Sequence, residues 1–132
     1  MKKITAYVRT CMAEKVLDAL LERGIRGVSV FQGKGFVPHT KGPAQGSFDT
    51  ATEDGLVAVA KLEIVSSDSA ADAIIRVIQE HAHTGRPGDG KIFILDVVAA
   101  HDIRTSEGFT EPCEVPRAQC LGTKKGEGSP KD

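Results

Sequence analysis

Residues 56–97 read LVAVAKLEIVSSDSAADAIIRVIQEHAHTGRPGDGKIFILDV and hold one complete strand–helix–strand unit. The run from Leu56 to Val65 is apolar and rich in β-branched residues, which is typical of a strand. Ser66 to Ser69 then offers several helix N-caps. The stripe that follows has the helical period and consists of Ile74, Ile75, Ile78 and Ala82. A second strand is predicted from Lys91 to Val97, where β-branched and aromatic residues return.

The first third of the chain repeats this pattern. Lys3 to Arg9 (KITAYVR) alternates as a strand does, and Gly27 to Gly33 (GVSVFQG) does so again. The segment between them has a helical stripe that ends at Gly24 and comprises Val16, Leu17, Leu20 and Leu21. Two such units predict an α+β protein with the ferredoxin-like βαβ-βαβ fold, in which one antiparallel sheet carries both helices on one face.

A sheet of this kind leaves its second face uncovered. Neither unit has a further helix to cover it, so Phe31, Val57, Val59 or their neighbours on that face need another partner. Burial against copies of the same chain is the simplest solution, because homo-oligomers with closed symmetry are the commonest protein assemblies. We therefore expect a closed homo-oligomer.

The domain organisation follows from where the periodic patterns stop. One domain is predicted over residues 1–105, interrupted by a long segment at about 36–55 that is rich in Gly, Pro, Thr and Ser. A loop of that length inside a small domain is usually functional or disordered. Residues 106–132 form a C-terminal tail that ends in GTKKGEGSPKD and is expected to be partly disordered.

Composition excludes several classes of protein. The formal net charge of −1 argues against the strongly basic surface that nucleic acids or acidic membranes require. No stretch is long and apolar enough to insert into a bilayer. Three cysteines in 132 residues do not make a disulfide framework, which favours a cytoplasmic location and a reduced, packed Cys11.

The glycine-rich run at residues 84–91 (TGRPGDGK) is the strongest candidate for chemistry. Successive backbone amides around glycines can form an anion-binding concavity, and Lys91 and Arg104 would add positive charge for phosphate oxygens. The run satisfies G-x-x-x-x-G-K, but Ile92 replaces the Ser or Thr of a P-loop and Lys91 begins a strand. From these residues alone, a phosphate site and a simple glycine turn both remain open.

The same run resembles the PII family of signalling proteins. That family carries T-G-x-x-G-D-G-K-I-F before its last core strand and an I-R-T segment after it, which stand here at Thr84–Phe93 and Ile103–Thr105. Further matching landmarks are Met1–Ile4, Leu17–Leu20, Gly24–Ile25, Gly27, Lys34–Phe36 and Lys61–Val65. The resemblance implies a homotrimer that binds AMP, ADP or ATP between subunits and contacts a target protein through a T-loop, here residues 36–55.

The resemblance also implies roles for individual residues. The nucleotide-binding set would be Gly27, Val28 and Ser29 on the base and ribose side, Gly35, then Gly88, Asp89, Gly90 and Lys91 around the phosphates, and Arg104 as a clamp. Two positions depart from the family, because Val59 replaces a phosphate-binding Lys and Asp102 replaces a second Arg. Losing two cations weakens triphosphate binding most, so ADP and AMP are expected to compete well with ATP.

The T-loop departs from the family as well. Val37, Pro38 and His39 replace the Gly-Arg-Gln whose Gln helps to bind magnesium and 2-oxoglutarate, and the loop has no tyrosine for uridylylation. The sequence thus resembles the subgroup associated with carboxysomes and bicarbonate transport, with bicarbonate as effector beside Lys34 and Gly35 and a bicarbonate transporter or carbon-fixation component as target. A classical nitrogen regulator that senses ATP and 2-oxoglutarate, and a metal-transport-associated PII-like regulator, remain alternatives.

Other function classes have less support in the residues. No nucleophile is paired with a base, so no catalytic residue is assigned, and an aromatic content of 5% gives an RNA-binding sheet few stacking platforms. His81 and His83 do not face each other on a helix, so no metal site is predicted. Cys113 and Cys120 could close a redox-sensitive loop in the tail, but the scarcity of cytosolic disulfides favours two unrelated thiols.

Overall fold

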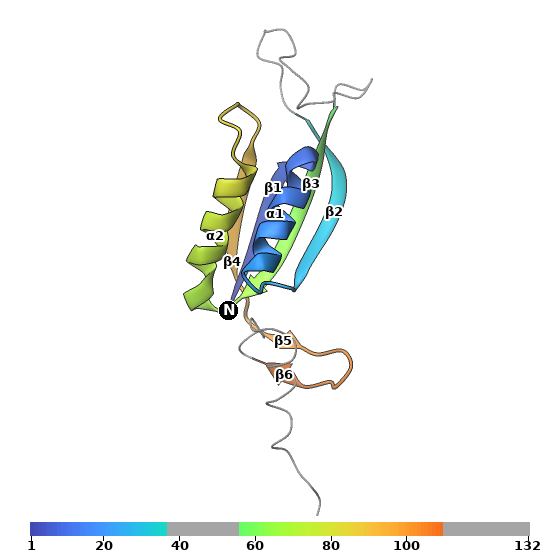
Figure 1. Ribbon diagram of the computed structural model, residues 1–132. Helices are drawn as coiled ribbons and strands as arrows, with labels where there is room; N and C mark the ends of the chain where they lie inside the picture. Colours follow the sequence, from blue (N-terminus) through green and yellow to red (C-terminus); the bar gives the residue numbers. More distant parts are fainter. Residues whose placement is uncertain (37–55, 110–132) are drawn as a thin grey trace, which may run out of the picture.

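The first strand of the chain lies in the middle of the sheet. In the computed structural model, which describes residues 1–36 and 56–109, a four-stranded antiparallel sheet has the order β2-β3-β1-β4. Its elements are β1 (Lys2–Arg9), α1 (Thr10–Glu22), β2 (Val28–Phe36), β3 (Leu56–Ser66), α2 (Asp68–Ala82) and β4 (Gly90–Asp96). Both helices cover the same face of the sheet (Figure 1), which confirms the predicted ferredoxin-like fold.

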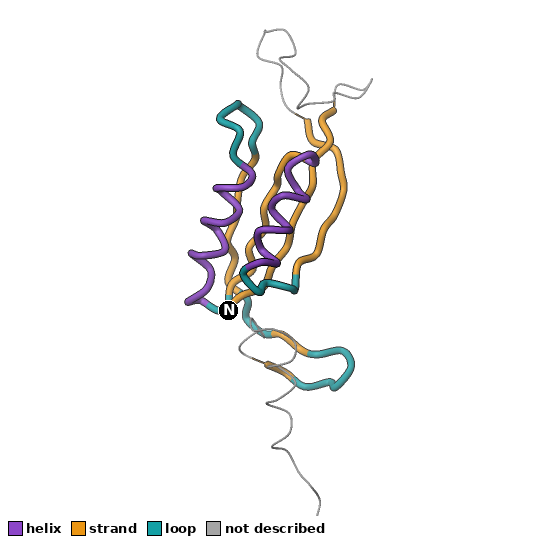
Figure 2. Tube along the Cα trace, in the orientation of Figure 1, coloured by secondary structure: helices purple, strands orange, loops and turns teal. Residues whose placement is uncertain are grey.

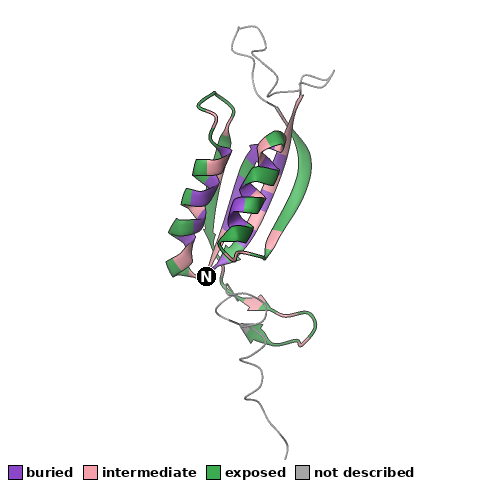
Figure 3. Cartoon of the chain, in the orientation of Figure 1, coloured by how far each residue is buried: buried purple, intermediate pink, exposed green. Residues whose placement is uncertain are grey.

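The core lies between this face and the two helices. Ile4 of β1 stands opposite Ile64 of β3, and Ala6 stands opposite Leu62, so alternate residues of both strands point toward the helices. The helices close the core with their apolar stripes, from which Val16, Leu20, Ile74 and Ile78 are almost fully buried. Figure 3 shows buried residues gathered along β1 and β3 beneath the helices, with exposed residues along β2.

The helix ends follow from local sequence. Ser67 caps α2, because its hydroxyl accepts a hydrogen bond from the Ala70 amide at 3.3 Å, as the Ser-rich run predicts. At the end of α1, Gly24 has φ of 82°, its amide donates to the Leu21 carbonyl at 2.9 Å, and the Ile25 amide donates to the Leu20 carbonyl at 3.0 Å. This Schellman motif turns the chain directly into β2.

The second face of the sheet has no covering element among the described residues. Phe31, Phe93 and Leu95 point to this side and are each about half exposed. We call this side the open face. It confirms the expectation of an uncovered sheet face.

Two details differ from the sequence-based expectations. Beyond β4, a small hairpin forms from β5 (Ala100–His101) and β6 (Gly108–Phe109), below the main sheet in Figure 2. Strands of two residues leave no periodic pattern, so none was predicted there. Cys11 is exposed on α1 and not packed, because the stripe of this helix that faces the core begins at Ala13 and Val16.

Candidate nucleotide site

The glycine-rich loop between α2 and β4 adopts a conformation that only glycine accommodates well. Gly85, Gly88 and Gly90 have positive φ angles of 82°, 99° and 110°. At Gly90 the constraint is also steric, because an added Cβ would lie 1.7 Å from the carbonyl oxygen of Tyr7 on β1. The loop therefore lies tightly against the end of the first strand.

Asp89 organises this loop from within. Its Oδ2 accepts hydrogen bonds from the backbone amides of Thr84 (2.8 Å) and Gly85 (3.0 Å), and its Oδ1 accepts from the Thr84 hydroxyl. Partial burial alone would raise the pKa of Asp89, but these bonds and one from Arg9 outweigh it and hold the pKa well below the usual range. Asp89 is thus an anion that closes the loop on itself.

Arg9, the last residue of β1, lies beneath the loop. Its side chain is only 3% exposed, its Nε lies 3.1 Å from Asp89 Oδ1, and its Nη2 donates to the Pro87 carbonyl oxygen at 2.8 Å. No motif in the sequence predicts a role for Arg9. Its only sequence signal was a charged residue at the end of a strand, which is common in proteins.

A cavity of about 440 Å³ opens beside this loop on the open face. It brings together five of the predicted residues, namely Gly35, Gly88, Asp89, Gly90 and Lys91. Val59 lies in its wall, at the position where the resemblance described above implies a lysine. Arg86 also lines the cavity, although it was not predicted as a site residue. Strand alternation places Lys34 on the helix side of the sheet, so Lys34 is not brought into this cavity with Gly35.

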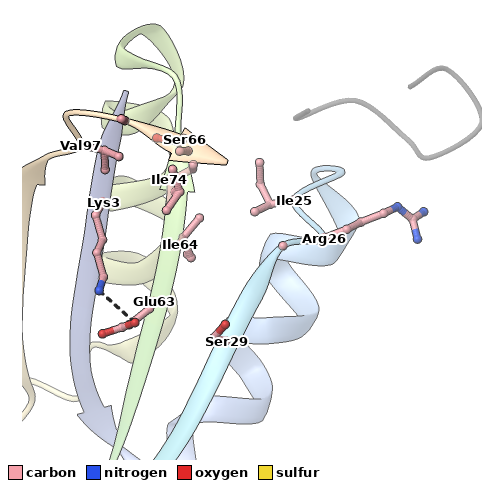
Figure 4. A pocket seen from close by; sticks show the side chains of 13 residues that line it. Lys3, Ile25, Arg26, Ser29, Glu63, Ile64, Ser66, Ile74 and Val97 are labelled. Atoms are coloured by element: carbon pink, nitrogen blue, oxygen red, sulfur yellow. Dashed lines mark ion pairs between the residues drawn. The ribbon is translucent and has the colours of Figure 1, made fainter. Parts of the chain in front are cut away.

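A second cavity of about 480 Å³ lies at the other end of the sheet, where β2 begins (Figure 4). Gly27 and Ser29 line it, and Val28 pairs with Ile64 between them. Its wall also carries Lys3 and Glu63, whose charged groups lie 3.1 Å apart and are joined by the dashed line in Figure 4. Glu63 was not predicted as a site residue.

Arg104 lies in the turn that joins β5 to β6. Asp102 builds this turn, because its Oδ1 accepts from the amides of Arg104 (2.8 Å) and Thr105 (3.2 Å). The Asp102 amide also donates to the Glu107 carbonyl at 2.7 Å. The Asp102 carboxylate thus has a structural role in its own turn, a role that the sequence analysis did not assign to it.

The two groups of predicted ligands do not meet within one chain. Val28 stands in the sheet row of Ile4, whereas Gly90 stands opposite Val8, four residues further along β1. That separation is about 13 Å along the strand. Figure 1 places the start of β2 and the β5–β6 hairpin at one end of the sheet and the glycine-rich loop at the other.

Metal ligation has no support in the described part of the chain. No group of three or more His, Cys, Asp or Glu residues is placed to hold a metal ion there. The Nδ1 atom of His81 lies 2.8 Å from the Val77 carbonyl oxygen, which occupies one ring nitrogen within the helix. Cys113 and Cys120 lie outside the described residues.

The fold places this domain in the ferredoxin-like class, and comparison with known proteins identifies its family. The family model described as "Nitrogen regulatory protein P-II" matches residues 1–107. The chain is 39% identical over 107 residues to the nitrogen regulatory protein P-II of Azospirillum brasilense, which covers 81% of this chain and 95% of that protein. The chain therefore belongs to the PII family.

Two comparisons with a plant relative agree with this assignment. The P-II homolog of Arabidopsis thaliana is 39% identical over 105 residues, covering 80% of this chain and 54% of that protein. The crystal structure of Arabidopsis thaliana PII bound to citrate superposes with a TM-score of 0.66 at 37% identity, covering 82% of this chain and 84% of that one. Among the helices described here, none has the length and hydrophobicity needed to cross a membrane.

Proposed function

We propose that this protein is a homotrimeric regulator that binds adenine nucleotides in clefts between its subunits. PII proteins are non-enzymatic signal transducers that act as trimers and bind target proteins. The observation that carries the proposal is the separation of the predicted ligands into two groups at opposite ends of one sheet. A cleft between neighbouring copies would join the glycine-rich loop of one subunit to Gly27–Ser29 and Arg104 of the next.

The open face supports the trimer. Its exposed apolar side chains include Tyr7, Phe31, Val65, Phe93 and Leu95. Tyr7, Phe93 and Leu95 lie together on β1 and β4, while Lys61 lies between Phe31 and Tyr7 and Lys3 lies between Val65 and Leu95. The rings of Tyr7 and Phe93 pack edge to face with centroids 6.1 Å apart. Apolar patches of this kind in a small domain are typical of a subunit interface.

Val59 supports a preference for shorter nucleotides. It lies in the wall of the cavity beside Gly35 and Gly88, where a lysine would reach the outer phosphates. A charge-assisted hydrogen bond contributes about 1.5–3 kcal/mol, so its absence affects ATP more than ADP or AMP. Lys91 and Arg86 remain as cations on this side of the cleft.

The cavity is well placed to act on the T-loop. Gly35 and Val57 line it: Gly35 directly precedes the segment 36–55, the T-loop that the family resemblance implies, and Val57 lies two residues after it. A ligand that fixes the ends of a loop shifts its population toward the conformations compatible with those ends. We propose that nucleotide binding controls target binding in this way, in the cytoplasm and without chemical turnover.

A small anion is proposed as the second effector. The Val37-Pro38-His39 sequence favours bicarbonate, with a bicarbonate transporter or carbon-fixation component as target. The names of the relatives favour the alternative, a nitrogen regulator that responds to ATP and 2-oxoglutarate. The citrate bound by the Arabidopsis protein is a tricarboxylate, larger than bicarbonate, so it supports binding of an organic acid such as 2-oxoglutarate more than binding of bicarbonate. Because Lys34 faces the helix side, we place the anion near Gly35 and Lys91 instead.

Titration calorimetry of the full chain tests the proposal. AMP, ADP and ATP are titrated with and without bicarbonate, and separately with magnesium and 2-oxoglutarate. We expect ADP or AMP to bind and bicarbonate to tighten the binding. Lys91→Ala should weaken the binding of ADP and ATP, while Lys15→Ala on the exposed surface of α1 should leave their binding unchanged. Tightening of ATP by 2-oxoglutarate would establish the nitrogen alternative, and the absence of nucleotide binding would refute the proposal.

A further inference from the structure

Arg9 is one of two buried residues on the open side of β1. Thr5 is 8% exposed and Arg9 is 4% exposed, whereas Lys3 and Tyr7 are more exposed, and Arg9 alone of the buried pair is charged. Burying a charged group costs free energy unless the group is paired and hydrogen-bonded. Arg9 is both, and its partners include Pro87 and Asp89 of the glycine-rich loop.

The guanidinium supports three consecutive residues of that loop. It donates to the Pro87 carbonyl and to the Asp89 carboxylate, and Gly88 lies directly over it. A Cβ added at Gly88 would lie 3.3 Å from Nη2, so glycine permits this close approach. The planar fork of arginine can hold two acceptors in a fixed geometry, which the single ammonium group of lysine cannot.

Asp89 extends this support to the other end of the loop. Its Oδ1 contacts Arg9, while its Oδ2 accepts the amides of Thr84 and Gly85 at the start of the loop. One carboxylate therefore links the end of α2, the residues before β4 and the first strand. Both of its oxygens have protein partners, which leaves Asp89 poorly suited to bind phosphate directly.

We infer that Arg9 and Asp89 are positioning residues for the nucleotide phosphates: they fix the backbone of residues 84–90 in its binding conformation without contacting the ligand. This inference rests on the proposed function and assigns Asp89 a different role from the one the family resemblance suggested. Direct contacts are left to the backbone around Gly88 and Gly90 and to Lys91. The base and ribose contacts, at the other end of the sheet, should not depend on this pair.

Nucleotide affinities of four variants test the inference. Arg9→Gln, Arg9→Lys, Asp89→Asn and the double variant Arg9→Gln/Asp89→Asn are compared with the wild type and with Lys15→Gln as a surface control. We expect each single substitution to weaken ADP and ATP about tenfold while adenosine affinity stays unchanged. The double variant should lose little more affinity for ADP and ATP than either single variant, because the two residues act as a unit.

Hydrogen exchange without nucleotide gives a second readout. The amides of Thr84 and Gly85 should exchange faster in Arg9→Gln than in the wild type, while those of β1 and β3 stay protected. Equal losses of affinity for adenosine and for ATP would indicate general damage to the nucleotide site and would overturn the inference. Unchanged ADP affinity in all four variants would also overturn it. If the wild type bound no nucleotide, the proposed function and the ligand role of the pair would both fail, and the exchange data would still decide whether Arg9 holds the loop.

Discussion

The two faces of the sheet come from the same strands but differ in the side chains that they carry and in how far those side chains are buried. On the helix face of β1 and β3, Ile4, Ala6, Ala60 and Leu62 are apolar and 0% exposed. On the open face, Lys3 and Lys61 flank Glu63 at 3.1 Å each, Lys61 lies 4.6 Å from the centre of the Phe31 ring, and the aromatic side chains remain half exposed. The helix face stabilises one subunit, and the open face offers groups to a second copy.

The largest expected effect comes from the helix face. Leu62→Ala removes a side chain that is 0% exposed, leaving a cavity that the surrounding core cannot close. We expect a loss of about 2–5 kcal/mol in the free energy of unfolding. Leu21→Ala, at an exposed leucine of α1, is the control and should change little. Urea unfolding followed by circular dichroism measures the unfolding free energy of both variants. Similar losses of stability in Leu62→Ala and Leu21→Ala would contradict the assignment of the core to the helix face.

A substitution on the open face should separate association from folding. Phe93 is 50% exposed in one subunit, so Phe93→Asp should leave the circular dichroism spectrum intact while its charge prevents close packing of copies. The expected result is a monomer in size-exclusion chromatography with light scattering. Leu21→Asp, at a side chain that is 51% exposed on α1, should retain the oligomer of the wild type. A monomeric wild type would refute the role assigned to this face.

Asp89 should contribute stability that depends on pH. Its folded pKa is lowered, since its hydrogen bonds to Thr84, Arg9 and Gly85 outweigh its partial burial, so its contribution is fully present above the ordinary aspartate pKa of about 3.9 and is lost as the pH falls below it. We expect Asp89→Asn to cost about 2 kcal/mol at neutral pH. The difference from the wild type should shrink in unfolding titrations below about pH 4. A constant difference would show that the charge is not involved.

The smallest effect is expected at Glu63. Lys3 and then Lys61 lower its pKa by hydrogen bonds, yet the three side chains remain partly open to solvent. Exposed ion pairs contribute little and are screened by salt. Glu63→Gln should therefore shift the thermal midpoint only slightly, and less in high salt. A large shift that high salt does not reduce would mean that this cluster is buried in the assembled protein.

The fold was predictable because its signals are local. Alternation in Lys3–Arg9 and the stripe around Ile74 and Ile78 each fix one element, and the order of the elements then selects the fold. The β5–β6 hairpin was not predictable, because two-residue strands have no period. The exposure of Cys11 was also missed, since a single apolar residue near a helix start does not show which way it points.

The candidate site was predictable only in part. The glycines and Lys91 were found because their spacing is itself a motif, and the structure places them around one cavity. The role of Arg9 was not predictable, because its partner Asp89 lies 80 positions away and neither residue is unusual alone. Asp102 shows the same limit, since its turn-forming role depends on backbone geometry that the sequence does not specify.

The position of β1 has a consequence for how the chain folds. This strand is made first, but its two neighbours in the sheet are β3, at residues 56–66, and β4, at residues 90–96. Contacts between such distant parts of a chain raise the contact order and slow folding. During synthesis on the ribosome, β1 therefore has neither neighbour in the sheet until residues 56–66 of β3 have emerged, and the Arg9 contact forms only after the glycine-rich loop has been made.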